Sequence, residues 1–92
     1  MEVNFYATLR RVVGAKSVEF DLDAGATIAQ LLEEMLLRYP ALRHELFDEQ
    51  GQLYQHVHIF VNGRDVSFLQ LGMDTPLSER DAIGVFPAVG GG

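Results

Sequence analysis

The chain has 92 residues, a formal net charge of -6 and no cysteine. This length supports one domain with a single core, and the lack of cysteine excludes disulfides, a thiolate nucleophile and cysteine-based metal sites. The acidic balance disfavours nucleic acid as a direct partner and suits a partner with a basic docking face. We expect a cytoplasmic protein that does not enter membranes, because the sequence has neither a basic leader before an apolar run nor a stretch of membrane-spanning length.

Residues 2–8 alternate between apolar and polar side chains, which is the period of a half-buried strand. A short helical connection over residues 9–13 ends at Gly14, and residues 16–22 alternate again. The side chains expected to point inward are those of Val3, Phe5, Ala7, Val18, Phe20 and Leu22. These segments predict a first pair of strands joined by a loop.

A helix is expected to begin at Thr27 and to end at Pro40. Thr27 lies three residues before Gln30, which is the spacing of a capping box. The apolar residues that recur at intervals of three and four are Ile28, Leu31, Leu32, Met35 and Leu36. This pattern predicts a helix with one apolar stripe facing a core.

A short helical turn is expected over residues 41–47, followed by a mobile polar surface loop over residues 48–52. Val57, Ile59 and Val61 then alternate with His56, His58 and Phe60, which indicates a third strand. Asn62-Gly63 is a strong signal for a tight hairpin turn. It predicts a short fourth strand over residues 64–66.

A fifth strand is expected over residues 82–86, and we expect Phe68, Leu69 and Leu71 to fill the edge of the core. The order of elements predicts a two-layer α+β domain with one main helix on one face of a mixed sheet of four to five strands. The other sheet face is then uncovered. The aromatic residues expected on it are Tyr6, Phe60 and Phe86. If the first and last strands are neighbours, these rings lie together and form a docking surface.

The C-terminal segment is the most unusual feature of the sequence. We divide the chain into a domain over residues 1–87 and a flexible tail over residues 88–92, in which Val89 precedes Gly90, Gly91 and Gly92. Glycine has the slimmest cross-section and the widest choice of backbone angles. Such a tail could enter a narrow channel and present the Gly92 carboxylate there, although a frayed end is the alternative interpretation. The apolar strand that continues almost to the end favours a function.

Other groups of polar residues give weaker evidence of a function. His56 and His58 have a spacing that can bind a metal, but no third ligand is identifiable, so we predict no metal site. Arg10 and Arg11 either hold an acidic residue of a partner or cap the first loop. No nucleophile and base are paired, and we therefore do not expect an enzyme.

Several motifs together resemble the ubiquitin-like β-grasp sulfur carriers, a family that includes the small subunit of molybdopterin synthase and the thiamine-pathway carrier. The matching segments are Phe5-Tyr6-Ala7-Thr8-Leu9-Arg10 before Gly14, Thr27 opening a Leu-rich helix, Tyr39-Pro40, Phe60-Val61-Asn62-Gly63 with Asp65, Thr75-Pro76-Leu77 with Asp81, and Phe86-Pro87-Ala88-Val89 before the glycines. The resemblance covers nearly the whole chain and is most specific at its two ends. The longer segment over residues 39–55 is more similar to the cysteine-pathway and archaeal members.

The resemblance implies a carrier that binds no cofactor itself. A ubiquitin-activating-type enzyme would use ATP to adenylate Gly92, and a sulfur donor would convert the carboxylate to a thiocarboxylate. The acceptor would be an enzyme such as the molybdopterin synthase large subunit or a cysteine synthase. Gly90 and Gly91 would thread the partner's channel, and the partner-binding residues would be Tyr6, Phe60, Phe86, Pro87 and Val89. The family usually has alanine where Gly90 stands, a change that adds an ordering cost on the order of a few tenths to 1 kcal/mol when the tail binds.

Two alternatives keep the same fold. The Gly92 carboxylate could instead be joined to lysines of target proteins, as in a ubiquitin-like modifier. The chain could also be a β-grasp binding module without sulfur chemistry.

Overall fold

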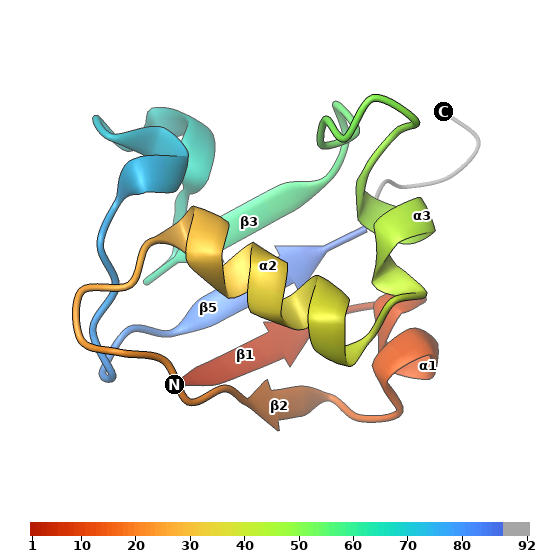
Figure 1. Cartoon of the computed structure of the whole chain (residues 1–92), viewed down its shortest axis with the longest axis horizontal. Helices are drawn as coiled ribbons and strands as arrows, with labels where there is room; N and C mark the ends of the chain where they lie inside the picture. The colour runs from red at the N-terminus through yellow and green to blue at the C-terminus, as the bar shows by residue number, and fades with distance from the viewer. Residues whose placement is uncertain (88–92) are drawn as a thin grey trace.

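The computed structural model describes residues 1–87 as a five-stranded mixed sheet with one helix packed across it (Figure 1). The strands are β1 (Glu2–Phe5), β2 (Ser17–Glu19), β3 (His58–Val61), β4 (Arg64–Asp65) and β5 (Ile83–Phe86). Their order across the sheet is β2-β1-β5-β3-β4. Strands β1 and β5 are parallel, and every other neighbouring pair is antiparallel. The first and last strands are therefore central neighbours.

The helical elements lie on one side of this sheet and at its ends. They are α1 (Leu9–Val13), α2 (Ile28–Arg38), α3 (Leu42–Leu46) and the 3-10 turns η1 (Val66–Phe68) and η2 (Gly72–Asp74). Figure 1 shows α2 lying across one face of the sheet, with α1 and α3 beside each other at one end. Within residues 1–87 no helix covers the opposite face (Figure 1). The expected α+β β-grasp architecture is confirmed.

The core lies between α2 and the inward side of the sheet. The fully buried members with the largest side chains are Phe5, Leu9, Ile28, Leu31, Met35, Leu42, Leu46 and Ile83. The capping box is also present. The backbone nitrogen of Gln30 donates to Thr27 Oγ1 at 3.2 Å, and the backbone nitrogen of Thr27 donates to Gln30 Oε1 at 2.8 Å. Local periodicity and capping therefore predicted the main helix and its buried stripe correctly.

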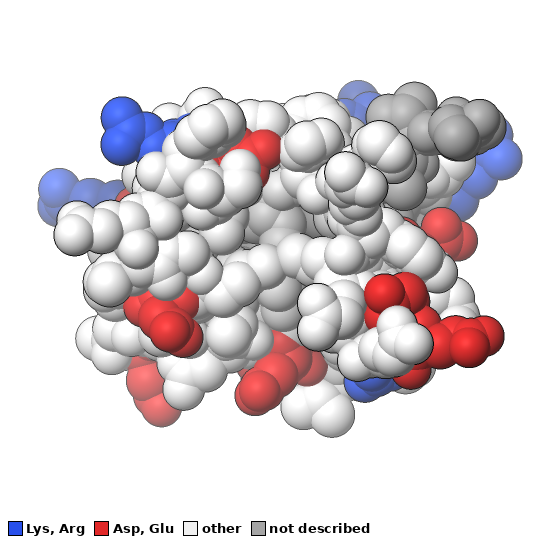
Figure 2. Space-filling model, turned by 90° about the horizontal axis from the view of Figure 1, so that it is seen from above, with Lys and Arg blue, Asp and Glu red and all other residues white. Residues whose placement is uncertain are grey.

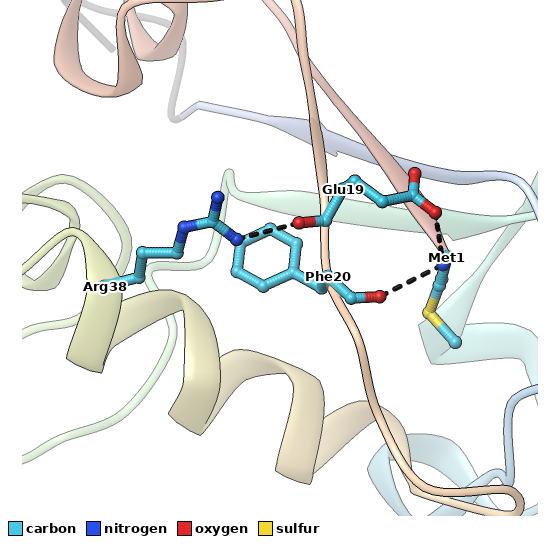
Figure 3. A network of polar contacts seen from close by, with 4 residues as sticks. All are labelled: Met1, Glu19, Phe20 and Arg38. Carbon is cyan, nitrogen blue, oxygen red and sulfur yellow. Dashed lines mark hydrogen bonds and ion pairs between the residues drawn. The ribbon is translucent and has the colours of Figure 1, made fainter.

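A polar network ties the end of α2 to the edge strand β2 (Figure 3). Arg38 Nη1 donates to the Glu19 carbonyl oxygen at 2.7 Å, and its guanidinium lies 5.1 Å from the centre of the Phe20 ring. The Met1 α-amino group donates to Glu19 Oε1 at 2.8 Å and to the Phe20 carbonyl oxygen at 3.0 Å. The Arg38 contacts fix the end of α2 against the end of β2, and the Met1 contacts fix the N-terminus at the same place.

Some expected details are wrong. Strand β1 ends at Phe5, so Ala7 is not an inward strand residue; it is exposed with a φ of 52° in the turn before α1. Phe68 and Leu71 do not fill the core edge, since their exposed fractions are 79% and 59%, whereas Leu69 packs against the core. The fourth strand is shorter than expected because Val66 begins η1.

No helix within residues 1–87 combines the length and apolar character needed to cross a membrane.

Candidate functional site

The uncovered face of the sheet carries three aromatic side chains on neighbouring strands. Tyr6 directly follows β1, Phe60 lies in β3 and Phe86 ends β5, and each follows or precedes a buried inward residue. The Tyr6 nitrogen donates to the Val85 carbonyl oxygen at 3.2 Å, which extends the β1–β5 pairing to Tyr6. The sheet order therefore brings the three rings together as an aromatic patch, which we define as Tyr6, Phe60 and Phe86.

The rings of the aromatic patch contact one another directly. The Tyr6 and Phe86 rings are stacked, with centroids 4.1 Å apart and planes 1° from parallel. Phe60 meets Phe86 edge to face, with centroids 5.3 Å apart. Aromatic pairs of these kinds contribute about 0.5–1.5 kcal/mol beyond their buried area. All three side chains remain half-buried, so the patch is ordered yet open to a partner.

Arg10 supports this patch from α1. Its Nε donates to the Phe5 carbonyl oxygen at 2.8 Å, and its guanidinium carbon lies 5.3 Å from the centre of the Tyr6 ring. Arg10 therefore caps the loop after β1, which is one of the two roles expected for it. The neighbouring Arg11 is exposed.

A hollow of about 280 Å³ adjoins the aromatic patch on the same face. Its lining residues are Asn4, Tyr6, Phe60, Gly63, Ala82, Ile83, Gly84 and Phe86. Gly84 forms the floor, because a Cβ on it would lie 3.3 Å from Tyr6 Cε2 and 3.6 Å from Phe86 Cε2. The role of Gly84 was not predicted from the sequence, although a glycine inside a strand often marks a close approach by another group.

His58 borders the patch on β3, where it pairs with Phe86 across the strands. Its Nδ1 donates to Asp65 Oδ2 at 2.8 Å. Asp65 Oδ1 also accepts from the Ser67 backbone nitrogen, and this bond is the main reason that the pKa of Asp65 is lowered. His56 lies in the turn before β3 rather than on the strand. No group of three or more His, Cys, Asp or Glu side chains within residues 1–87 is arranged to hold a metal.

The turn at Asn62-Gly63 is linked to the start of β5. Both residues have positive φ, 52° and 81°, as the tight hairpin turn requires. The Asn62 side chain also donates to Asp81 Oδ1 at 2.9 Å and accepts from the Ala82 nitrogen at 2.9 Å. The Ser78 nitrogen donates to Asp81 Oδ2, and this bond is the main reason that the pKa of Asp81 is lowered. The sequence predicted the turn but not this link.

The end of β5 is the root of the C-terminal segment. Pro87 is buried next to Phe86, and its assigned contact with a partner stays a prediction. The residues assigned to the tail, Val89, Gly90, Gly91 and Gly92, lie outside the described residues, as does the proposed domain boundary at residue 88.

Charge is unevenly distributed over the surface. In the view of Figure 2, Asp and Glu side chains are most numerous in the lower half, and most Lys and Arg side chains stand at the left and right margins. In the sequence, no acidic residue lies between Glu2 and Glu19, whereas this segment contains Arg10, Arg11 and Lys16. This segment, which includes α1, therefore carries positive charges only.

A β-grasp sheet with an open aromatic patch on its central strands defines a ubiquitin-like protein of the carrier and modifier class. The sequence comparison identifies the family, because the model described as the ThiS family matches residues 3–92. The chain belongs to this family of ubiquitin-like sulfur carriers.

Individual relatives show the same relationship. The chain is 41% identical to small archaeal modifier protein 3 of Haloferax volcanii over 92 residues, which cover 100% of this chain and 98% of the relative. It is 32% identical to the sulfur carrier protein CysO of Mycobacterium tuberculosis over 81 residues, which cover 86% of this chain and 83% of the relative. The crystal structure of SAMP1 from Haloferax volcanii matches with a TM-score of 0.82 and 32% identity, covering 99% of this chain and 97% of that chain. These proteins are carriers or modifiers by name, and none is named as an enzyme.

Proposed function

We propose that the chain is a sulfur carrier whose Gly92 carboxylate is adenylated and then converted to a thiocarboxylate. The sulfur would be donated in the biosynthesis of a molybdopterin-type cofactor, of cysteine or of a related product. The observation that carries this proposal is the aromatic patch at the end of β5, the strand that leads into residues 88–92. Family membership and the similarity to a sulfur carrier from Mycobacterium tuberculosis support it.

The chemistry suits a chain without cysteine, because no thiol of its own can carry the sulfur. Adenylation by a ubiquitin-activating-type enzyme gives the Gly92 carbonyl a good leaving group, and sulfur from a donor then replaces AMP. The resulting thiocarboxylate is a nucleophile at neutral pH. The chain itself would supply the reactive end and the docking surface, while ATP and catalytic groups would come from the partner.

The aromatic patch is suited to docking because its rings are already ordered by contacts with one another. A partner that covers it loses little additional side-chain freedom, which lowers the cost of binding. A stable interface buries about 800 Å² on each partner, so we expect the patch to form the apolar centre of a larger contact. The net charge of -6 favours a partner whose rim is basic.

A second candidate function follows from the relatives. The 41% identity to small archaeal modifier protein 3 extends over the whole chain. A protein modifier uses the same adenylated glycine, but an amine of a target protein takes the place of sulfur. Isopeptide-linked C-terminal peptides of this chain on cellular proteins would identify this function.

The direct test is the intact mass of the full chain after incubation with ATP, the adenylating enzyme encoded in the same genome and a sulfur source. We expect a mass increase equal to the difference between sulfur and oxygen. A variant without Gly91 and Gly92 should show no increase while unfolding at the same urea concentration, because the buried core lies within residues 3–85. An unchanged mass of the full chain, in a mixture shown to thiolate a known carrier, would rule out the sulfur-carrier function.

A further inference from the structure

The imidazole of His58 stands at the margin of the aromatic patch. Its ring centroid lies 6.2 Å from that of Phe60, and His58 is directly opposite Phe86 across the β3–β5 pairing. Residues that are directly opposite in a sheet share one face, so His58 lies on the uncovered face. Its side chain is 49% exposed. A partner that covers the patch therefore meets this ring as well.

Asp65 determines which nitrogen of His58 carries a proton. Asp65 Oδ1 accepts from the Ser67 backbone nitrogen and from Ser67 Oγ, each at 2.9 Å. The bond from the backbone nitrogen is the main reason that the pKa of Asp65 lies below its ordinary value, so the carboxylate is ionised at neutral pH. An ionised carboxylate only accepts hydrogen bonds. Because Asp65 Oδ2 lies 2.8 Å from His58 Nδ1, the proton belongs on Nδ1.

The other ring nitrogen, His58 Nε2, is left as a hydrogen-bond acceptor. A neutral imidazole that donates through one nitrogen accepts through the other, and a carboxylate on the donor side makes the acceptor nitrogen more basic. Within residues 1–87, Nε2 forms no hydrogen bond. The Asp65–His58 pair thus offers the partner a free lone pair together with one negative charge.

The opposite side of the aromatic patch carries a positive charge. The Arg10 guanidinium carbon lies 5.3 Å from the centre of the Tyr6 ring, on the β1 side of β5, whereas His58 and Asp65 lie on the β3 and β4 side (Figure 1). Charges of opposite sign on two sides of an apolar centre select one orientation of a complementary partner. In that orientation a cationic group of the partner faces His58.

We propose that His58 determines the specificity of docking, because its Nε2 accepts a hydrogen bond from a guanidinium or ammonium group of the partner enzyme. This inference rests on the proposed docking through the aromatic patch and names the chemistry that the partner places beside it. Asp65 is a positioning residue, since it acts through the His58 ring.

Proton uptake by His58 works against this contact. A protonated imidazole has no acceptor nitrogen, and the Asp65–His58 pair then loses its net negative charge. Histidine side chains ordinarily take up a proton between pH 8 and pH 5. The groups that face His58 are Asp65 from β4, Phe60 on β3 and Phe86 on β5, and the two phenylalanines do not titrate. We therefore expect docking to weaken as the pH falls through this range.

The protonated nitrogen of His58 can be identified without a partner. Long-range ¹H–¹⁵N correlation spectra of the labelled full chain at about pH 8 should show a proton on Nδ1 and none on Nε2. Asp65→Asn should reverse this, because the Ser67 backbone nitrogen requires the amide oxygen as its acceptor and leaves the amide NH₂ facing the ring. An Nε2 proton in the wild-type chain, or an unchanged tautomer in Asp65→Asn, would overturn the positioning by Asp65.

Isothermal titration of the full chain against the adenylating enzyme encoded in the same genome tests the contact itself. At about pH 8, His58→Phe should raise Kd about 10-fold to 150-fold, because it keeps an aromatic ring but removes both nitrogens. Asp65→Asn should also raise Kd, since its Nε2 no longer accepts. At about pH 5.5 the wild-type chain should lose most of its advantage over His58→Phe. Comparing the two chains at each pH cancels titration of the enzyme's other groups.

His44→Phe is the matched control. His44 is exposed on α3, which does not lie on the uncovered face (Figure 1), so its replacement should leave Kd unchanged at both pH values. Urea unfolding of His58→Phe shows that the variant is folded, as expected because phenylalanine is favoured in strands.

The outcomes distinguish this inference from the proposed function. An unchanged Kd for folded His58→Phe at about pH 8 would overturn the role of His58. A loss that is equally large at both pH values would contradict the Nε2 acceptor, and a wild-type chain that gains affinity over the variant as the pH falls would show an imidazolium that donates to an acidic partner group instead. No binding of the wild-type chain at either pH, to an enzyme shown to be active, would refute docking through the patch, and the role of His58 would fall with it.

Discussion

Replacing Gly84 by alanine tests whether the hollow beside the aromatic patch belongs to the docking surface. Gly84 is buried in the middle of β5, in register with Asn4 of β1 and Phe60 of β3. Its φ lies outside the left-handed region, so alanine fits the backbone. The added Cβ would lie 3.3 Å from Tyr6 Cε2, which requires the Tyr6 ring to move by a few tenths of an ångström.

Two effects of this change on folding oppose each other. Alanine restricts the unfolded chain, which stabilises the fold by about 0.4–1 kcal/mol. Displacing the half-buried Tyr6 ring from its stack on Phe86 costs energy of similar size, since such a pair contributes about 0.5–1.5 kcal/mol. The free energy of unfolding should therefore change by less than about 1 kcal/mol.

The effect on docking should be larger, because the methyl group fills the floor of the hollow. If an apolar partner side chain occupies the hollow, overpacking costs about 1–3 kcal/mol, which corresponds to roughly a 5-fold to 150-fold increase in Kd. Isothermal titration against the adenylating enzyme and urea unfolding of the same samples measure the two quantities. Leu37→Ala is the control, because Leu37 is 75% exposed on α2 in the opposite layer, and its docking should not change.

An unchanged Kd for Gly84→Ala with unchanged stability would refute a role of the hollow in docking. A loss of more than about 2 kcal/mol of stability would contradict the expectation that the Tyr6 ring can yield at modest cost.

Phe60→Ala should weaken docking by about 1–4 kcal/mol if the aromatic patch holds the hot spots, and an unchanged Kd in the same titration would leave recognition to the C-terminal segment. Thr27→Ala removes the cap of α2 and should lower the free energy of unfolding by about 1 kcal/mol in urea; no change would mean that the cap contributes nothing. In the folded state the pKa values of Asp65 and Asp81 are lowered below their ordinary value of 3.8. Their ionised carboxylates therefore stabilise the fold above pH 3.8, and this contribution is lost as the pH falls through the lower folded pKa values. Urea midpoints between pH 6 and 3 should fall for the wild type and fall less for Asp81→Asn, and parallel curves would contradict this assignment.

The sequence was sufficient where structure depends on local pattern. The alternation around Val3 and Phe5 placed β1, and the spacing of Thr27 and Gln30 placed the start of α2 within one residue. The grouping of the aromatic rings required one more fact, the pairing of β1 with β5, which joins segments about 80 residues apart. No local pattern in the sequence indicates that pairing. The grouping of the rings could therefore be predicted only on the condition that the first and last strands are neighbours.

The errors around residues 66–71 have a different cause. A 3-10 turn repeats every three residues, so Val66 and Leu69 point to the same side and reach the core, while Phe68 points away. Apolar character alone predicted burial for Phe68 and Leu71, but the turn type decides which of these side chains can turn inward. The role of Gly84 was missed for a similar reason, because its importance comes from the Tyr6 ring of the neighbouring strand.

Strand β5 links the core with the aromatic patch and precedes the C-terminal segment. Its inward residues Ile83 and Val85 are almost completely buried, and its outward residues Gly84 and Phe86 form part of the hollow and the aromatic patch. Because β5 pairs with β1 on one side and β3 on the other, opening it requires breaking the centre of the sheet, and such central elements open only at close to the full free energy of unfolding. The aromatic patch and Pro87, the last described residue, are thus held in one fixed relation. A partner that binds the aromatic patch would therefore set the starting point of the C-terminal segment at the same time.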